Sequence, residues 1–176
     1  MRIIAGLGLC LWTLGVAGVA GAADAPPAPA AAPASNVPAP QSADADPALA
    51  NADKLKGKTI TTPLYKVYDG NKVDPDTLNG WKTWRAMACE RCHGQAQEGL
   101  VGPPLVVSLK TLTKDQFHTT IMKGRIQKGM PPFETSKMVN DNWEHLYAYL
   151  QGRAEGNILP GHLYAMDSAK QAANGP

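Results

Sequence analysis

Residues 89–93 read Cys89-Glu90-Arg91-Cys92-His93, two cysteines three positions apart with a histidine directly after the second. C-x-x-C-H is the attachment signature of c-type haem, in which two thiols form thioethers and the histidine binds iron. Two thiols at a helix end reach two edges of one macrocycle, while the next side chain points under its centre. The pentapeptide therefore predicts one covalent haem c, attached to Cys89 and Cys92 with His93 as an axial ligand.

Two other kinds of site use similar cysteine pairs. A thioredoxin-like redox pair needs a strand-helix-strand context, which the surrounding sequence lacks. Zinc needs further cysteines or histidines at ligand spacing. His118, His145 and His162 are scattered singly, and there is no second cysteine pair. Haem remains the preferred interpretation.

The third cysteine, Cys10, lies in an N-terminal segment with the layout of a secretory signal. Arg2 supplies the positive end, residues 3–19 are apolar, and Ala20-Gly21-Ala22 offers small residues for cleavage. We expect residues 1–23 to direct export to the periplasm and to be removed, Cys10 with them. A retained membrane anchor is the alternative, because the apolar run is nearly long enough to span a bilayer.

The composition of the rest of the 176 residues separates a spacer, a folded domain and a short tail. Seven of the 15 prolines fall between Asp24 and Pro47, and alanine fills most other positions there. Ordering such a segment costs backbone entropy with little burial to offset it. Residues 24–58 are therefore predicted to be a disordered spacer, 59–167 the folded domain, and 168–176 a flexible tail. No further segment is apolar enough to span a membrane.

The net charge indicates which partners to expect, and the helix caps indicate where helices begin. A formal net charge of +2 lacks the strongly basic balance of nucleic-acid binding, so nucleic acid is not an expected partner. A first helix is predicted from the cap Asp74, with proline in its first turn, to about Cys89 or Arg91. A second begins at the capping box of Thr113 and ends at Gly124.

A third helix is predicted after the cap Asp141, with apolar residues at i, i+3, i+4 and i+7 before Gly152 closes it. Only residues 59–68 read as a short extended segment. Three helices, long loops and 6% aromatic residues make a thin core. We expect an all-α domain with a porphyrin in its middle.

The opposite axial position on iron separates electron carriers from oxygen chemistry. Met130 is the best candidate, because Pro131 stiffens the chain after it and Gly129 allows a close turn before it. The alternative is a core methionine, and the chain offers competitors. These are Met87, Met122, Met138 and Met166.

The order of several motifs resembles the monohaem class I cytochromes c. After the pentapeptide come Gly102-Pro103 with Leu105, then Gly129-Met130-Pro131, then an aromatic C-terminal helix. The resemblance covers most of the folded domain. It implies the class I fold, with three main helices and long loops wrapped around one covalently bound haem.

The same resemblance implies two contacts. The carbonyl of Pro103 accepts a hydrogen bond from Nδ1 of His93, which leaves Nε2 for iron. The first helix crosses the last, with Gly80 and Trp84 set against an aromatic pair. That pair is Trp143 and Tyr147.

Flanking segments are similar to the cytochromes c-L and c-550 type. These segments are residues 65–74, Asn79-Gly80-Trp81, and the run 150–161. Such proteins are periplasmic electron acceptors of quinoprotein alcohol dehydrogenases, which oxidise methanol or ethanol on pyrroloquinoline quinone (PQQ). The resemblance implies a PQQ dehydrogenase as electron donor, and a downstream cytochrome c or terminal oxidase as acceptor.

Lys123, Arg125 and Lys128 precede Met130 closely, and are candidates for contacts with an acidic partner or with the haem propionates. A merely solvated face is the alternative. Contacts of an electron carrier are small and transient, so a monomer is expected. Two other functions stay open: a haem enzyme with an open axial site, and a haem subunit of a larger oxidoreductase.

Overall fold

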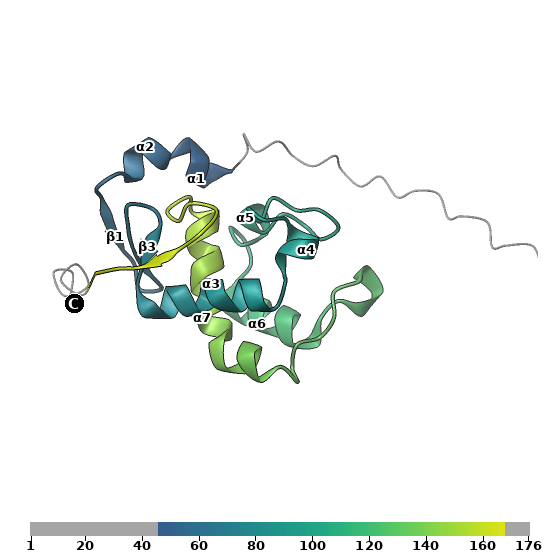
Figure 1. Cartoon of the computed structure of the whole chain (residues 1–176). Coiled ribbons are helices and arrows are strands. Elements are labelled where there is room, and N and C mark those ends of the chain that lie inside the picture. Colours follow the sequence, from purple (N-terminus) through teal and green to yellow (C-terminus); the bar gives the residue numbers. More distant parts are fainter. Residues whose placement is uncertain (1–45, 168–176) are drawn as a thin grey trace, which may run out of the picture. The chain divides into compact units, whose positions relative to one another are not determined.

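The computed structural model describes residues 46–167, in which helices surround a crossed pair and adjoin one small sheet (Figure 1). The elements in chain order are α1 (Pro47–Ala50), α2 (Ala52–Leu55), β1 (Thr59–Thr61), β2 (Lys66–Tyr68), β3 (Lys72–Val73), α3 (Pro75–Ala86), α4 (Glu90–His93), α5 (Leu105–Ser108), α6 (Lys114–Lys123), the 3-10 helix η2 (Ile126–Lys128), α7 (Lys137–Ala154) and β4 (Tyr164–Ala165). The predicted signal at 1–23, the spacer up to residue 45 and the tail at 168–176 lie outside the described residues. Within 46–167, no helix is long and apolar enough to cross a membrane.

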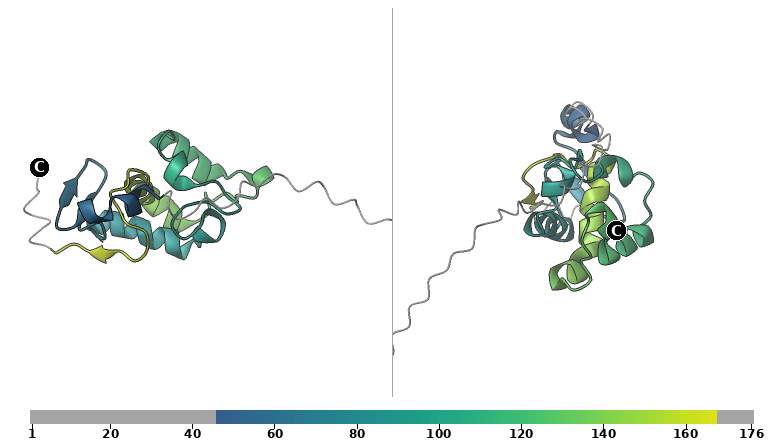
Figure 2. Two further views of the ribbon diagram at one scale, coloured as in Figure 1. Left: turned by 90° about the horizontal axis from the view of Figure 1, so that it is seen from above. Right: turned by 90° about the vertical axis from the view of Figure 1, so that its right-hand side faces the viewer.

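Helices α3 and α7 cross at the centre of the domain, as Figures 1 and 2 show from three directions. Gly80 makes the close approach possible, because a Cβ there would overlap the carbonyl oxygen of His145 and lie 2.9 Å from the nitrogen of Leu146. The helix crossing expected from the resemblance is therefore present. Its glycine packs directly on the backbone of α7.

The aromatic partners at this crossing differ from the expected ones. The ring of Trp84 lies 6.5 Å from that of Tyr149, centroid to centroid. Tyr147 instead packs its ring against Phe117, and Trp143 packs against His118. Trp143 and Tyr147 lie four positions apart on one face of α7, and that face is turned toward α6.

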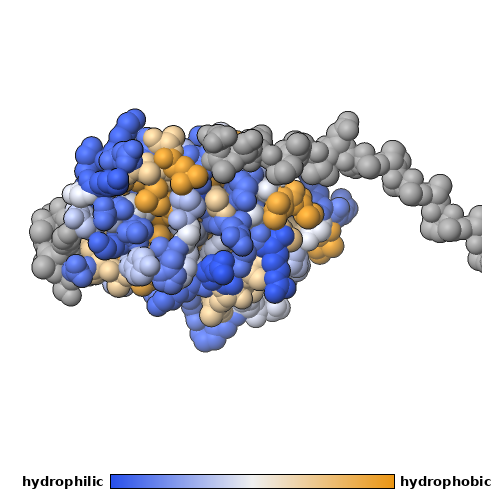
Figure 3. Space-filling view, turned by 45° about the horizontal axis from the view of Figure 1, so that its top comes forward, coloured by the Kyte–Doolittle hydropathy of each residue, from blue (hydrophilic) through white to orange (hydrophobic). Residues whose placement is uncertain are grey.

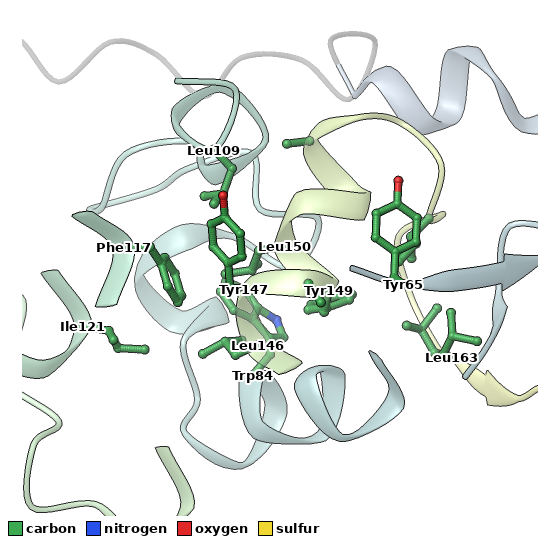
Figure 4. Packing of buried hydrophobic residues seen from close by; sticks show 14 of the residues in the cluster. Tyr65, Trp84, Leu109, Phe117, Ile121, Leu146, Tyr147, Tyr149, Leu150 and Leu163 are labelled. Atoms are coloured by element: carbon green, nitrogen blue, oxygen red, sulfur yellow. The ribbon is translucent and has the colours of Figure 1, made fainter. Parts of the chain in front are cut away.

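Buried apolar side chains form one cluster between α3, α6, α7 and the sheet (Figure 4). Trp84, Leu146 and Tyr149 lie at its centre, each no more than 2% exposed. Val67 and Val73 extend the cluster under the sheet, with 1% and 0% of their surface exposed. The core therefore joins the helices and the sheet into one unit.

The four strands form one sheet in the order β1-β2-β3-β4, so the all-α prediction is wrong in this respect. β1, β2 and β3 are successive antiparallel neighbours, and β4 returns from the far end of the chain to pair parallel with β3. Only residues 59–68 were predicted to be extended. β3 and β4 have two residues each, too few for alternation to be recognised in sequence.

Thirteen of the described residues, 46–58, fall in the segment that composition assigns to the spacer. They contain the short helices α1 and α2. The side chain of Asp46 caps α1 by accepting a bond from the nitrogen of Ala48 at 2.8 Å, and it also pairs with buried Arg153. Because this ion pair joins residues 107 apart, local composition gave no sign of it.

The predicted caps hold for two of the three main helices. The Asp74 carboxylate accepts bonds from the nitrogens of Asp76 and Thr77 at 3.0 Å, and Thr113 with Gln116 forms a complete capping box. Helix α7 starts earlier than expected: its cap is Ser136, not Asp141, and it runs to Ala154. Asp141 instead lies within the helix, where it pairs with Lys137 at 2.7 Å.

Candidate functional site

The two cysteines of the pentapeptide lie at the start and in the middle of the short helix α4, directly after α3. Ala88, in the turn between the helices, has a φ of +53°, an uncommon value for a residue with a side chain. Cys89 is half-buried, Cys92 is exposed, and neither is in a disulfide. Both thiols are therefore available for covalent attachment.

Burial raises the pKa of the Cys89 thiol to about 12, and the neighbouring carboxylate of Glu90 adds to this effect. A thiol with this pKa is protonated at neutral pH, so it is a poor spontaneous nucleophile. The arrangement therefore differs from that of redox-active cysteine pairs, whose thiol pKa is lowered.

His93 ends α4, and the next loop fixes its ring. The ring nitrogen Nδ1 lies 2.9 Å from the carbonyl oxygen of Pro103, the contact that the class I resemblance implies. Gly102 packs against the same edge of the ring: a Cβ there would lie 2.7 Å from Cε1 of His93 and 2.8 Å from Nδ1. These two contacts orient the imidazole and leave Nε2 as its remaining ligand atom.

Main-chain bonds tie the loop after α4 back to the pentapeptide. The nitrogen of Gly99 donates to the carbonyl of His93 at 2.8 Å, and that of Gly102 donates to the carbonyl of Cys92 at 2.7 Å. On the core side, the ring of Trp84 lies 6.3 Å from that of His93. The histidine is thus held between a closed loop and helix α3.

Met130 closes a small hairpin. The nitrogen of Arg125 donates to the carbonyl of Met130 at 2.8 Å, the reverse bond measures 3.2 Å, and η2 lies between the two residues. Gly129 adopts the left-handed conformation with a φ of +81°, which favours glycine. The half-buried side chain of Met130 therefore has a rigid backbone on both sides.

The competing methionines lie elsewhere. Met122 and Met166 are buried, at 9% and 3% exposed, and Met122 belongs to the main cluster. The sulfur of Met87 accepts a bond from the hydroxyl of Ser136 at 3.7 Å. Met138 is 46% exposed in the first turn of α7. Among these, only Met130 lies in a turn-bounded loop.

The basic residues here are all exposed: Lys123 ends α6, and Arg125 and Lys128 lie within the hairpin itself. Arg125 donates a long bond of 3.5 Å to the hydroxyl of Thr120. The described residues thus present three cations close in sequence to Met130.

The other interpretations of the cysteine pair lack structural support in the part of the chain described. The cysteines follow a helix, not the strand that a thioredoxin-like site requires. Within residues 46–167, no three His, Cys, Asp or Glu side chains gather as a metal site. His118 stacks on Trp143 at 4.3 Å, and His145 lies 3.7 Å from Asp76, so both histidines are engaged at the helix surface.

Sequence reasoning missed a buried polar cluster next to the loop after α4. Its members are Asp46, Gln97 and Arg153, of which Gln97 and Arg153 are 0% exposed. A basic residue in the last turn of a helix ordinarily indicates a favourable helix-dipole interaction at the surface. No sequence pattern links three residues so far apart.

The residues present fit a c-type haem. Two thiols that form no disulfide precede a histidine whose Nδ1 is already engaged. Apolar side chains of the two loops are exposed, with Val101 at 84% and Ile126 at 73%. Apolar residues form separate patches on the face shown in Figure 3. This donor set and these apolar loops suit a largely apolar ring.

Three comparisons with known proteins agree with this fit. Residues 75–150 match the family model described as cytochrome c oxidase, cbb3-type, subunit III. Cytochrome c-555 of Methylococcus capsulatus (Bath) is 45% identical over 92 residues, which cover 52% of this chain and 73% of that protein. The crystal structure of the c-type cytochrome XoxG of Methylobacterium extorquens AM1 matches with a TM-score of 0.50 and 26% identity, covering 72% of this chain and 87% of that one.

Proposed function

Because this chain belongs to the c-type cytochromes, electron carriers with covalently bound haem c, we propose that a PQQ-dependent alcohol dehydrogenase is its electron donor. The fold is that of a class I c-type cytochrome with a small added sheet. The observation that carries the site assignment is the bond between His93 and Pro103, since it orients one ligand nitrogen away from the loop.

Four residues would hold the haem in the proposed site. Cys89 and Cys92 would attach the ring through thioethers, and His93 and Met130 would bind its iron. Haem c supplies one-electron exchange when bound. The protein residues set the conditions for it: a neutral thioether favours the reduced state and raises the potential.

Pro103 acts on His93 rather than on the haem. Its carbonyl at 2.9 Å keeps the proton on Nδ1, which fixes the tautomer and orients the ring. The rigid hairpin around Met130 lowers the entropy lost when its thioether is held in one orientation. Both proposed ligands would thus be offered to iron by preorganised backbone segments.

An electron-transfer role, not an enzymatic one, agrees with the related proteins. A substrate-converting haem would need an open axial position and a nearby group able to transfer protons. The two histidines considered for this role, His118 and His145, have partners on α7 and α3 instead.

The choice of donor rests on the segments that resemble the cytochrome c-L and c-550 type. Residues 65–74 contain β2 and β3, and residues 150–161 contain the end of α7. The side chain of Asn157 donates to the hydroxyl of Tyr65 at 2.6 Å, so the two segments pack together. The two segments that resemble this type of cytochrome are thus in contact with each other in the fold.

The proposed carrier is a periplasmic monomer that passes electrons to a downstream cytochrome c or terminal oxidase. Export rests on the signal-like residues 1–23. Lys123, Arg125 and Lys128 would steer an acidic partner toward the Met130 loop, because opposite charges speed diffusional encounter.

The experiment that tests this donor mixes the oxidised protein with a reduced PQQ alcohol dehydrogenase of the same organism. Stopped-flow absorbance should show rapid haem reduction at low ionic strength that slows as salt is added. Absence of reduction, with the same dehydrogenase active toward an artificial acceptor, would contradict the proposal.

A second candidate is a haem subunit held in a larger oxidoreductase, favoured by the match of residues 75–150 to an oxidase-subunit family model. The two roles differ in assembly. Solubilised membranes run on a native gel should show the haem protein alone if it is a free carrier, and in a large complex if it is a subunit.

A further inference from the structure

The guanidinium of Arg153 is fully buried, and each of its nitrogens has a protein partner. Nη1 donates to the carbonyl of Ile158 at 2.6 Å, and both Nη1 and Nη2 contact the carboxylate of Asp46. The other two bonds reach the loop after α4. Nε donates to Oε1 of Gln97 at 2.6 Å, and Nη2 donates to the carbonyl of Ala96 at 2.9 Å.

Five donors with five acceptors make this a saturated guanidinium site. Its charge is balanced by Asp46 inside the protein, where an unpaired charge would be strongly unfavourable. Arg153 therefore holds two consecutive residues of the loop in a fixed position relative to helix α7.

Gln97 also bonds to Leu105, at the other end of the loop. Its side chain donates to the hydroxyl of Tyr149 at 3.0 Å, and its carbonyl accepts from the nitrogen of Leu105 at 2.8 Å. Its φ of +61° is rare for a residue with a long side chain. Such a conformation persists when surrounding contacts determine it.

Leu105 is two residues after Pro103, the acceptor for His93. Two sets of hydrogen bonds thus hold the loop: Gly99 and Gly102 bond to the pentapeptide, and Gln97 bonds to Arg153 of α7. Both sets fix the position of the Pro103 carbonyl relative to the imidazole of His93.

We propose that Asp46, Arg153 and Gln97 are positioning residues for the axial histidine, which act by holding the Pro103 carbonyl against Nδ1 of His93. The proposal rests on the assignment of His93 as an axial ligand. None of the three side chains forms a hydrogen bond, ion pair or ring contact with His93. They act through the backbone of the loop between residues 94 and 105.

A hydrogen bond from Nδ1 makes the imidazole a stronger donor to iron, which favours the oxidised state. Weakening that bond should therefore raise the reduction potential. It should also expose the Nδ1 proton to solvent exchange. Loss of packing alone would lower thermal stability without moving these two quantities together.

The test is Gln97→Ala in the full-length holoprotein, a change that leaves the formal charge unaltered. We expect a higher midpoint potential, and exchange of the Nδ1 proton about tenfold faster by NMR of the reduced form. Thr77→Val is the matched control, because it removes another buried bond, the 2.7 Å bond to Asp74, on helix α3. It should lower the melting temperature and leave both readouts unchanged.

Asp46→Asn gives a second measurement if Gln97→Ala does not fold. It keeps the side-chain shape but loses the charge partner of Arg153, so faster Nδ1 exchange is expected here too. Unchanged exchange in the folded variants would overturn the proposal. A low-spin spectrum that survives His93→Ala would contradict the ligand assignment instead, so the two failures are distinguishable.

Discussion

The carbonyl oxygen of Pro103 faces Nδ1 of His93 across 2.9 Å, although ten residues separate them in the chain. Between them the chain makes a loop whose last turn, at Gly102, lies directly against the imidazole. The contact therefore depends on a position without a side chain.

Gly102→Ala should disturb the histidine. The added Cβ would lie 2.7 Å from Cε1 of His93, closer than real contacts allow, so ring or loop must shift. We expect a loss of about 1–3 kcal/mol in unfolding free energy and an altered low-spin spectrum. Gly57→Ala is the control for the spectrum: its φ of +69° means that alanine strains the backbone there too, but a Cβ at this position meets nothing within 4 Å. Equal effects on the spectrum would argue against the role of Gly102.

Met130→Ala should remove the weak near-infrared sulfur-to-iron band of the oxidised protein, because the proposed thioether ligand is lost. The potential should fall as well. Met138→Ala is the matched control, as its side chain is 46% exposed on α7. Retention of the band in Met130→Ala would remove this residue as the ligand.

A triple variant with glutamate in place of Lys123, Arg125 and Lys128 should be reduced more slowly by the donor. The salt dependence of the rate should also weaken. The control reverses three exposed lysines in the N-terminal segment, at positions 54, 56 and 58. Stopped-flow rates over a range of salt concentrations measure both effects. If the two triple variants behave alike, net charge rather than this cluster sets the rate.

Tyr149 should limit stability at alkaline pH. Burial raises the pKa of its phenol from 10.0 to about 12. Its stabilising contribution is therefore complete below pH 10 and is lost as the pH rises toward 12. We expect the unfolding free energy to fall there by up to about 1.4 kcal/mol per pH unit, and less steeply in Tyr149→Phe.

Denaturant unfolding followed by far-UV circular dichroism at fixed pH measures this slope. Tyr147→Phe is the control, since it removes a hydroxyl from the same helix that bonds to Leu112 at 3.4 Å. A slope as shallow in Tyr147→Phe as in Tyr149→Phe would contradict the assignment to Tyr149.

Features coded by neighbouring residues were predicted from sequence. The capping box at Thr113 and the cap at Asp74 both appear in the structure. The close packing of Gly80 on α7 and the contact between His93 and Pro103 followed from family resemblance rather than from any local pattern.

Features that depend on distant partners were not predicted. Strand β4 pairs with β3 across about ninety residues of sequence, and two residues show no periodicity. Helix α7 is capped by Ser136 rather than by Asp141, and both positions carry a side chain that can cap a helix. The burial of Arg153 was not predicted, because its five acceptor atoms come from three separate segments of the chain.

The ion pair between Asp46 and Arg153 also determines how short a working fragment can be. A truncated protein that starts at Thr59 would keep the whole pentapeptide and every main helix, yet it would bury a cation with no counter-charge. Breaking such a pair from one side costs about 3–5 kcal/mol, a large part of the ~5–15 kcal/mol that holds a domain together. A shortened or fused protein must therefore keep the carboxylate of Asp46, which follows directly on an Ala/Pro-rich stretch of sequence.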